Sequence, residues 1–245
     1  MNTHLGAQWR RLGRGLVLML TLAVLAGCAT GPNPRDPYES YNRRMTGFND
    51  DVDAMLLKPA ATAYKEVTPA VVRTGISNFF GNLEDVWSFA NSVLQLRPQA
   101  AVESALRFGV NTVFGLYGLL DIASEMGIEK HKEDFGQTLG RWGVPSGPYV
   151  VLPILGPSTV RDSLALAVDT PGGLAAGVEH VPTRNSLQAL RLLETRASLL
   201  RASRVLDEAA LDKYSFTRDV YLQRRRSQIS DGQGDEGGAI EPSEP

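Results

Sequence analysis

Residues 105–124 read ALRFGVNTVFGLYGLLDIAS and form the most apolar stretch of the chain outside its first 27 residues. The stretch approaches the length of a membrane span, yet Arg107, Asn111 and Asp121 interrupt it. Glycine also weakens an isolated helix. Two interpretations remain open: a buried pair of core helices, or a helix lying within a membrane boundary. Under either interpretation, the glycines would allow close packing of helices, at Gly109, Gly115 and Gly118.

Helical periodicity extends on both sides of this stretch. Asp36-Pro37-Tyr38-Glu39 is typical of a capping box, and the helix after it should end at Lys58-Pro59. Further helices are predicted from Thr68-Pro69, from a cap at Asn82, from a cap at Ser158 to about Val168, and over 186–203. No sustained alternation of period two is present, so the predicted class is all-α.

Glycine and proline are most frequent over residues 140–157. These residues exclude a helix there, and residues 149–155 should form an apolar, extended segment. We expect this connection to be a flexible, membrane-facing element that controls access to a path through the protein. Its candidate gating residues are Tyr149, Leu152 and Pro153.

The amino terminus has the layout of a bacterial lipoprotein signal. Arg10, Arg11 and Arg14 precede an apolar run that ends in Leu25-Ala26-Gly27-Cys28. We expect residues 1–27 to be removed, Cys28 to be acylated, and 28–37 to form a tether. Two or more acyl chains hold a protein stably on a membrane. Ala29, in place of the Asp that retains lipoproteins in the inner membrane, predicts the periplasmic face of the outer membrane.

Composition excludes several classes of function. The mature chain has 22 basic and 27 acidic residues, so no net basic surface is available for nucleic acid. Its single cysteine is used by the anchor, which leaves no disulfide. His131 and His180 are its two histidines and make a poor metal site without cysteine. No catalytic motif, metal or cofactor is predicted. Residues 227–245 should be a disordered acidic tail, which leaves 38–226 as one helical domain.

A few charged residues lie in otherwise apolar sequence. Asp162 and Asp169 are two helical turns apart in STVRDSLALAVDT and share a face, with Arg161 beside it. They are candidates for the wall of a polar path, or solvated acids at a helix edge. Asp121 is a weaker candidate, whose alternative role is at a helix end.

Many short motifs, in order, resemble those of the MlaA (VacJ) lipoproteins, and the match runs from about Asp36 to Ser230. The strongest motifs are EDFGQTLG at 133–140, GPY at 147–149 with LP at 152–153, LGPS at 155–158 and RD at 161–162, and RDVY follows at 218–221. Supporting motifs are DPYE at 36–39, SNFFGNL at 77–83, GLLDIA at 118–123 and DKY at 212–214.

The resemblance implies a ring of helices lying in the inner leaflet of the outer membrane, with an amphipathic channel through it. Such proteins remove mislocalised phospholipids from the outer leaflet and pass them to a soluble periplasmic lipid carrier. They associate with trimeric porins and have no known catalytic centre. Two alternatives remain: a membrane-anchored lipid hydrolase using His131 or His180, and a porin scaffold that transports nothing. The helix over 38–57, with its Tyr41/Met45/Phe48/Val52 stripe, is either a lid or plain core packing.

Overall fold

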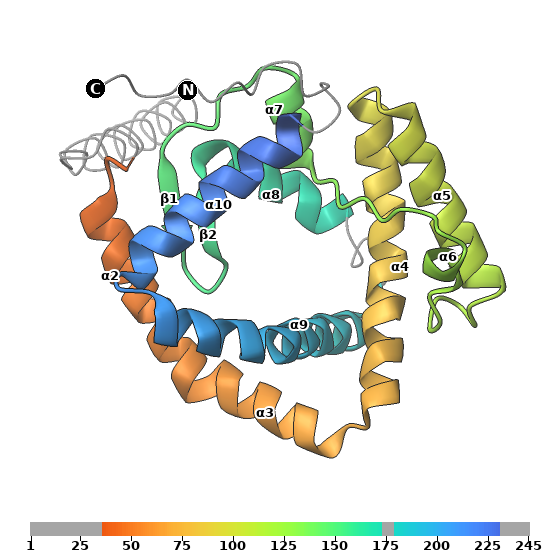
Figure 1. The fold of residues 1–245 in the computed structure, drawn as a ribbon, viewed down its shortest axis with the longest axis horizontal. Helices are drawn as coiled ribbons and strands as arrows, with labels where there is room; N and C mark the ends of the chain where they lie inside the picture. The colour runs from red at the N-terminus through yellow and green to blue at the C-terminus, as the bar shows by residue number, and fades with distance from the viewer. Residues whose placement is uncertain (1–35, 173–178, 231–245) are drawn as a thin grey trace, which may run out of the picture.

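The computed structural model describes residues 36–172 and 179–230, and its helices form a ring around an opening (Figure 1). The signal peptide, Cys28 and nearly all of the tether lie outside these residues. The described elements are α2 (Glu39–Val52), η1 (Asp53–Leu57), α3 (Lys58–Val67), α4 (Ala70–Leu94), α5 (Pro98–Val113), α6 (Ile122–Glu125), α7 (Phe135–Arg141), β1 (Tyr149–Leu152), β2 (Gly156–Thr159), α8 (Val160–Gly172), α9 (Val181–Ala209) and α10 (Lys213–Ser230).

The first helix does not end at Lys58-Pro59. Helix α2 continues through the π-helical turn η1 into α3, so the helical backbone passes through Lys58-Pro59. The capping box is also wrong. Asp36 is fully buried and accepts hydrogen bonds from Asn42 Nδ2 at 2.8 Å and from the Tyr214 hydroxyl. The motif therefore ties the start of the domain to α10 instead of capping α2.

Helices α4 and α5 form a hairpin along one side of the ring. The predicted break at Asn82 is wrong, because α4 is continuous and the Asn82 amide donates to the Thr112 hydroxyl of α5 at 3.0 Å. The apolar stretch of 105–124 is also no single helix, since α5 ends at Val113. At Gly118, φ is +89° and an added Cβ would lie 2.6 Å from Asn82 Nδ2, so this turn requires glycine.

The glycine- and proline-rich connection folds back as an antiparallel hairpin, in which Tyr149 pairs with Thr159 and Leu152 with Gly156. The sequence predicts extended structure in this connection, but it does not predict that two strands pair. Two asparagines of α2 fasten the hairpin: the Asn42 side chain bonds Tyr149 O and Val151 N, and the Asn49 side chain bonds Leu152 O and Ile154 N. Ser158 lies in β2, and Thr159 caps α8 instead by accepting from Asp162 N.

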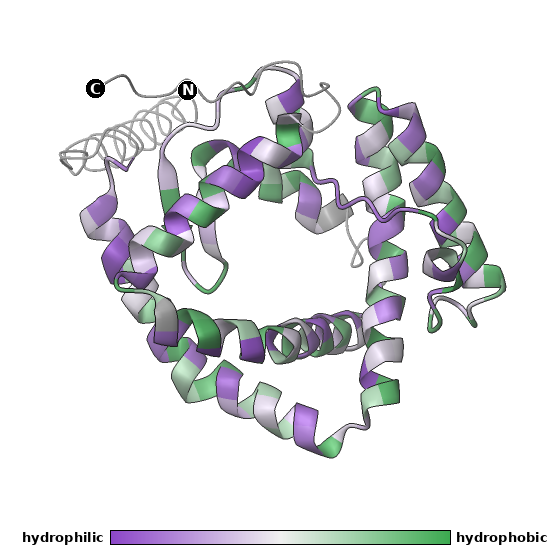
Figure 2. Ribbon diagram, viewed as in Figure 1, coloured by the Kyte–Doolittle hydropathy of each residue, from purple (hydrophilic) through white to green (hydrophobic). Residues whose placement is uncertain are grey.

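The usual distribution of polar and apolar residues is largely inverted. Among the residues that the structure describes, ten apolar side chains are buried, several of them alanines, whereas nineteen polar or charged residues are buried and many large apolar ones are exposed. Green and purple segments alternate along most helices in Figure 2. Extensive exposed apolar surface marks a protein that meets lipid or a partner. No helix within 36–172 or 179–230 has the length and hydropathy to cross a bilayer.

The second half of the ring consists of α8, α9 and α10. Helix α9 is longer at both ends than the predicted 186–203, and α10 continues to Ser230, past the predicted boundary at 226. Tyr149, Val151 and Tyr214 form a small apolar core, against which Met45, Tyr221 and Leu222 pack. This core joins α2, the hairpin and α10. Phe48 is 49% exposed, so core packing of the whole N-terminal stripe is excluded.

Candidate functional site

A cavity of about 1060 Å³ lies inside the ring. Its wall combines residues from α4, the segment before α7, the β-hairpin, α8, α9 and α10. The elements that build it therefore come from distant parts of the chain, between α4 and α10 (Figure 1). A volume of this size accommodates a ligand larger than most metabolites.

One part of the wall is apolar. Phe79, Leu83 and Trp87 are four residues apart on α4 and so project from one face of that helix into the cavity wall. Leucines from the hairpin, α8 and α9 complete this surface, namely Leu152, Leu155, Leu166 and Leu187. Hydrocarbon can be buried against such a surface without leaving polar groups unpaired.

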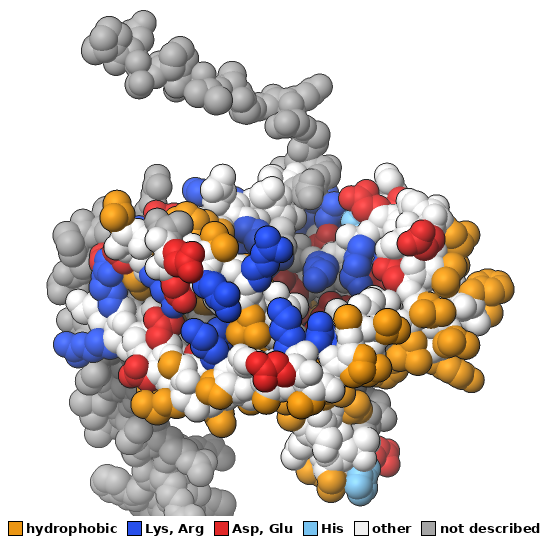
Figure 3. Space-filling view, turned by 60° about the horizontal axis from the view of Figure 1, so that its bottom comes forward, with side chains coloured by type: hydrophobic (Ala, Val, Ile, Leu, Met, Phe, Trp, Pro, Cys, Tyr) orange, Lys and Arg blue, Asp and Glu red, His pale blue; other side chains and the backbone are white. Residues whose placement is uncertain are grey.

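The same cavity carries a group of cations, and basic side chains surround the hollow in Figure 3. Arg191 pairs with Glu84, and Arg225 pairs with two aspartates. Within the described residues, the guanidinium groups of Arg184 and Arg224 make no ion pair. The cavity wall thus offers these two guanidinium groups close to apolar surface, although five carboxylates line the same cavity, namely Glu84, Glu133, Asp134, Asp162 and Asp169. The lining cations are Lys132, Arg184, Arg191, Arg224 and Arg225.

Arg225 holds two carboxylates from different helices. Its Nη1 and Nη2 lie 2.6 and 2.9 Å from the Asp134 oxygens, and its Nε lies 3.0 Å from Asp162 Oδ2. Burial raises the pKa of Asp162, but the hydrogen bonds and charge of Arg225 outweigh it and lower that pKa. The same balance lowers the pKa of Asp134. The Tyr221 hydroxyl also donates to Asp162 at 2.8 Å. These contacts join α7, α8 and α10.

Asp169 has a different environment from Asp162. Its Oδ1 accepts from Trp87 Nε1 and from Phe135 N, both at 2.8 Å, and no cation pairs with it in the described part. Burial dominates and raises the pKa of the Asp169 carboxyl. Both aspartates line the cavity, on the shared face that their spacing predicts. Whether either one contacts a passing ligand stays a prediction.

The other predicted site residues lie elsewhere. Arg161 bonds Asp162 at 2.9 Å and lines a neighbouring pocket of about 720 Å³ together with Tyr149. Asp121 lies among α4, α5 and α6, away from the cavity lining. Leu152 lines the cavity, whereas Pro153 is at the exposed hairpin turn.

Sequence reasoning missed most of the cationic wall. Arg225 is 63 residues from Asp162 in the chain, and Arg184 lies in a helix that reads as ordinary amphipathic surface. One local signal was available: Arg224-Arg225-Arg226 follows Tyr221 by helical spacing in an otherwise neutral body. Trp87 could be assigned to a helix face, but its bond to Asp169 could not.

The comparisons with known proteins agree with this geometry. The family model described as MlaA lipoprotein matches residues 34–228. An intermembrane phospholipid transport system lipoprotein MlaA of Escherichia coli K12 is 35% identical, covering 84% of this chain and 85% of the relative. Its counterpart in Haemophilus influenzae is 32% identical, covering 89% and 90%. A chain from the structure "Structural basis for maintenance of bacterial outer membrane lipid asymmetry" superposes with a TM-score of 0.69 at 34% identity, covering 79% of this chain and 98% of that one. This chain belongs to the MlaA lipoprotein family.

Proposed function

We propose that this protein carries phospholipids through the cavity of its ring and thereby maintains the lipid asymmetry of the outer membrane. The observation that carries the proposal is the composition of the cavity wall, in which the apolar face of α4 is opposed by cations without carboxylate partners. A phospholipid has the matching chemistry, with apolar chains and an anionic phosphate.

The physical problem for such a carrier is the headgroup. A charge moved through hydrocarbon costs several kcal/mol unless polar groups or water line its path. Arg184 and Arg224 would bind the phosphate, while Phe79, Leu83 and Trp87 would contact the acyl chains. Because Arg225 is already neutralised by Asp134 and Asp162, its role would be to hold the wall together. Arg161, Asp162 and Asp169 remain our candidates for polar groups along or beside the path, whereas Asp121 caps α6 away from the cavity lining.

The names of the relatives support a transport role for this chain. Their names place them in an intermembrane phospholipid transport system. We infer that acylated Cys28 anchors this chain at the periplasmic face of the outer membrane. The protein would take phospholipids from the outer leaflet and pass them to a soluble periplasmic carrier, beside a trimeric porin. The exposed apolar rim visible in Figure 3 suits contact with lipid or porin.

Charge reversal at the cavity tests the proposal. Arg184→Glu with Arg224→Glu should reduce phospholipid copurifying with the protein at least ten-fold, and should raise the outer-leaflet phospholipid accessible to added phospholipase in cells. Arg201→Glu with Arg204→Glu is the matched control, since both arginines are exposed on α9 and absent from the cavity lining. If both double variants behave as wild type, or both lose lipid equally, the cavity is not the lipid path.

Two alternatives differ in what they require. A hydrolase needs a histidine base at the lipid-binding site, but His131 bonds Glu103, His180 caps α9 by accepting from Thr183 N, and neither histidine lines the cavity. Relatives are named as transport proteins, which is consistent with a non-enzymatic role. An inert porin scaffold needs no polar wall, so Asp162→Ala with Asp169→Ala should leave lipid asymmetry intact under that alternative and disturb it under ours.

The anchor has its own test. Cys28→Ser should leave unprocessed precursor in the inner membrane and abolish function, because both acylation and sorting depend on that thiol. Membrane fractionation and an immunoblot for precursor size measure this outcome. Mature, active and soluble protein from that variant would refute the anchor.

A further inference from the structure

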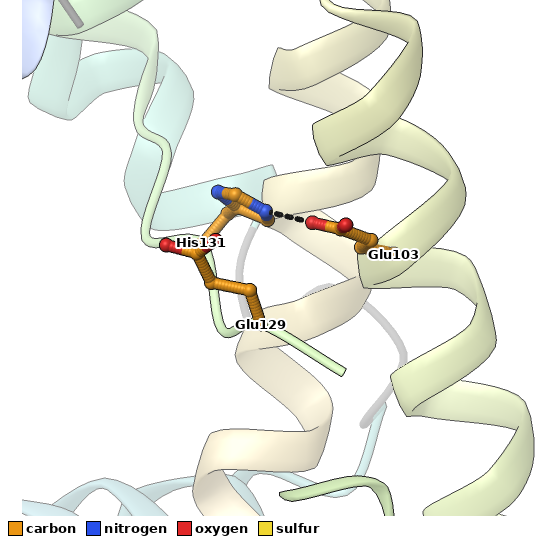
Figure 4. A group of neighbouring side chains, drawn as sticks. All are labelled: Glu103, Glu129 and His131. Carbon is orange, nitrogen blue, oxygen red and sulfur yellow. Dashed lines mark hydrogen bonds and ion pairs between the residues drawn. The ribbon is translucent and has the colours of Figure 1, made fainter. Parts of the chain in front are cut away.

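A cluster of potential metal ligands lies outside the cavity, between α5 and the segment that leads into α7. Glu103 projects from α5, while Glu129 and His131 lie on residues 126–134 (Figure 4). One ligand atom from each of the three side chains lies within 4.8 Å of the other two. His131 Nε2 is 2.5 Å from Glu103 Oε2. Two separate parts of the chain thus converge on one point.

The segment that carries two of these ligands is fastened on either side of them. Arg107 Nη1 donates to Ile128 O at 2.6 Å, directly before Glu129. Lys130 turns away from the cluster toward Asp85, with its Nζ 3.5 Å from Oδ1. Arg97 pairs with Glu133 beyond the cluster. The backbone is therefore held before any ion binds, which reduces the ordering cost of binding.

We propose that Glu103, Glu129 and His131 form a site for a divalent transition metal, with zinc as the ion that fits best. Imidazole and carboxylate are both zinc ligands, and three protein ligands plus one water complete a tetrahedron. Ligands at ~2.1 Å from a tetrahedral ion are about 3.4 Å apart, so small side-chain rotations close the site. The ion replaces the contact between His131 and Glu103, which requires neutral imidazole and releases any proton shared by that pair.

The proposed metal site lies next to the cavity wall in the chain. Lys132, Glu133 and Asp134 directly follow His131, and all three line the cavity. A bound ion would fasten this part of the cavity wall to α5. The site therefore links divalent metal to the rigidity of the wall, without the ion itself entering the cavity. Neither the binding nor its effect on the rigidity of the wall depends on the function proposed above; only a consequence for lipid transport would.

Cobalt provides a spectroscopic test on the full-length lipidated protein in detergent, freed of metal by chelation. Co²⁺ should bind at one equivalent with visible absorption bands, and Zn²⁺ should displace it. His131→Ala and Glu129→Gln should each weaken binding by roughly ten- to a hundred-fold. Glu129→Gln is the sharper variant, because in the described part its exposed carboxylate makes no hydrogen bond or ion pair to lose.

Two controls separate this site from general attraction of cations. Glu125→Gln removes an equally exposed acid from the neighbouring α6 and should leave Co²⁺ affinity unchanged. Hydrogen exchange at residues 128–133 should slow with Zn²⁺ in wild type and not in Glu129→Gln. No saturable binding up to millimolar Co²⁺, or equal losses in Glu125→Gln and Glu129→Gln, would overturn the site. Binding without slower exchange would overturn its coupling to the wall. Lipid transport enters neither readout.

Discussion

Arg107 and Arg225 each lie between two aspartates, in two regions of the molecule with opposite surroundings. Arg107, 1% exposed, pairs with Asp121 at 2.8 Å and approaches Asp85 to 3.5 Å inside the α4–α5–α6 corner. Arg225, 12% exposed, pairs with Asp134 and Asp162 on the cavity wall. An arginine held by two aspartates therefore lies in a buried corner in one region and on a cavity wall in the other.

The difference appears in how completely the charges are satisfied. Both Asp85 oxygens and Arg107 Nε are buried without a hydrogen bond, and burial raises the pKa of Asp85. The guanidinium nitrogens of Arg225 all bond carboxylates, and the pKa of both its partners is lowered. Arg107 and Asp85 are almost fully buried and line neither cavity described above, so we expect their charges to act on folding. We expect loss of Arg107 to cost mainly stability, and loss of Arg225 to cost both stability and transport.

The largest effect is expected from Arg107→Ala. It leaves Asp121 without its cation and Asp85 with Lys130 alone, and removing one partner of a buried ion pair typically costs about 3–5 kcal/mol. Arg107→Lys should not restore stability, because one ammonium cannot reproduce the contacts to Asp121, Ser124 and Ile128 O. Denaturant unfolding in detergent measures the loss. Asp50→Asn, which breaks an exposed pair with Lys213, is the control and should cost at most about 1 kcal/mol.

Arg225→Ala should cost less than Arg107→Ala, about 3 kcal/mol, because water in the cavity can hydrate the two carboxylates that remain. Phospholipid transport by Arg225→Ala should fall by more than the loss of folded protein alone accounts for. Arg224→Ala, on the same helix but exposed and without a carboxylate partner, should change stability by no more than about 0.5 kcal/mol. If Arg225→Ala were as damaging as Arg107→Ala, the two regions would not differ as we argue.

Much of the fold follows from local sequence, and the exceptions have a common cause. Helical class, the extended region at 149–155 and the helix after it are predictable from periodicity and from proline and glycine. The break at Asn82 was wrong because a polar residue inside an apolar helix reads as a cap, whereas here it bonds Thr112 of a neighbouring helix. In a protein whose polar side chains face inward, such residues mark helix packing instead of helix ends.

The candidate site was only half predictable. The seven-residue spacing of Asp162 and Asp169 places both on one helix face, and both do line the cavity. Their partners come from α4, α7 and α10, and no local pattern joins these segments. The capping of α8 by Thr159 instead of Ser158 shows the same limit on a smaller scale, because the Ser158 hydroxyl bonds Thr159 O and the Ser163 hydroxyl instead.

A pH titration sharpens the comparison at Asp121. Hydrogen bonds from Ser124, Asn111 and Arg107 outweigh burial and lower the pKa of Asp121 to about 2, against 3.8 ordinarily. The stability from this carboxylate is present above pH 3.8 and is lost as pH falls through about 2. We expect about 2 kcal/mol from this group. The difference in unfolding free energy between wild type and Asp121→Asn should shrink between pH 4 and pH 2. A difference that stays constant there would show that the charge does not stabilise the corner.

The smallest effect is expected from Asp169→Asn. Burial raises the pKa of Asp169, so wild type loses stability as pH rises from 3.8 through the raised value. Asparagine keeps one oxygen that can accept from both Trp87 Nε1 and Phe135 N, and it has no charge to desolvate. Stability at neutral pH should therefore change by less than about 1 kcal/mol, in the stabilising direction.

Asp169→Ala is the matched variant for that prediction. It removes the acceptor and leaves the indole N–H and the first amide of α7 unpaired, which should cost about 1–3 kcal/mol. Thermal unfolding of both variants across pH 4 to 8 separates the acceptor from the charge. If Asp169→Asn is as unstable as Asp169→Ala, the negative charge itself is required at the cavity wall. Asp169 would then resemble Asp162, whose charge Arg225 stabilises, and the contrast between the two aspartates would be lost.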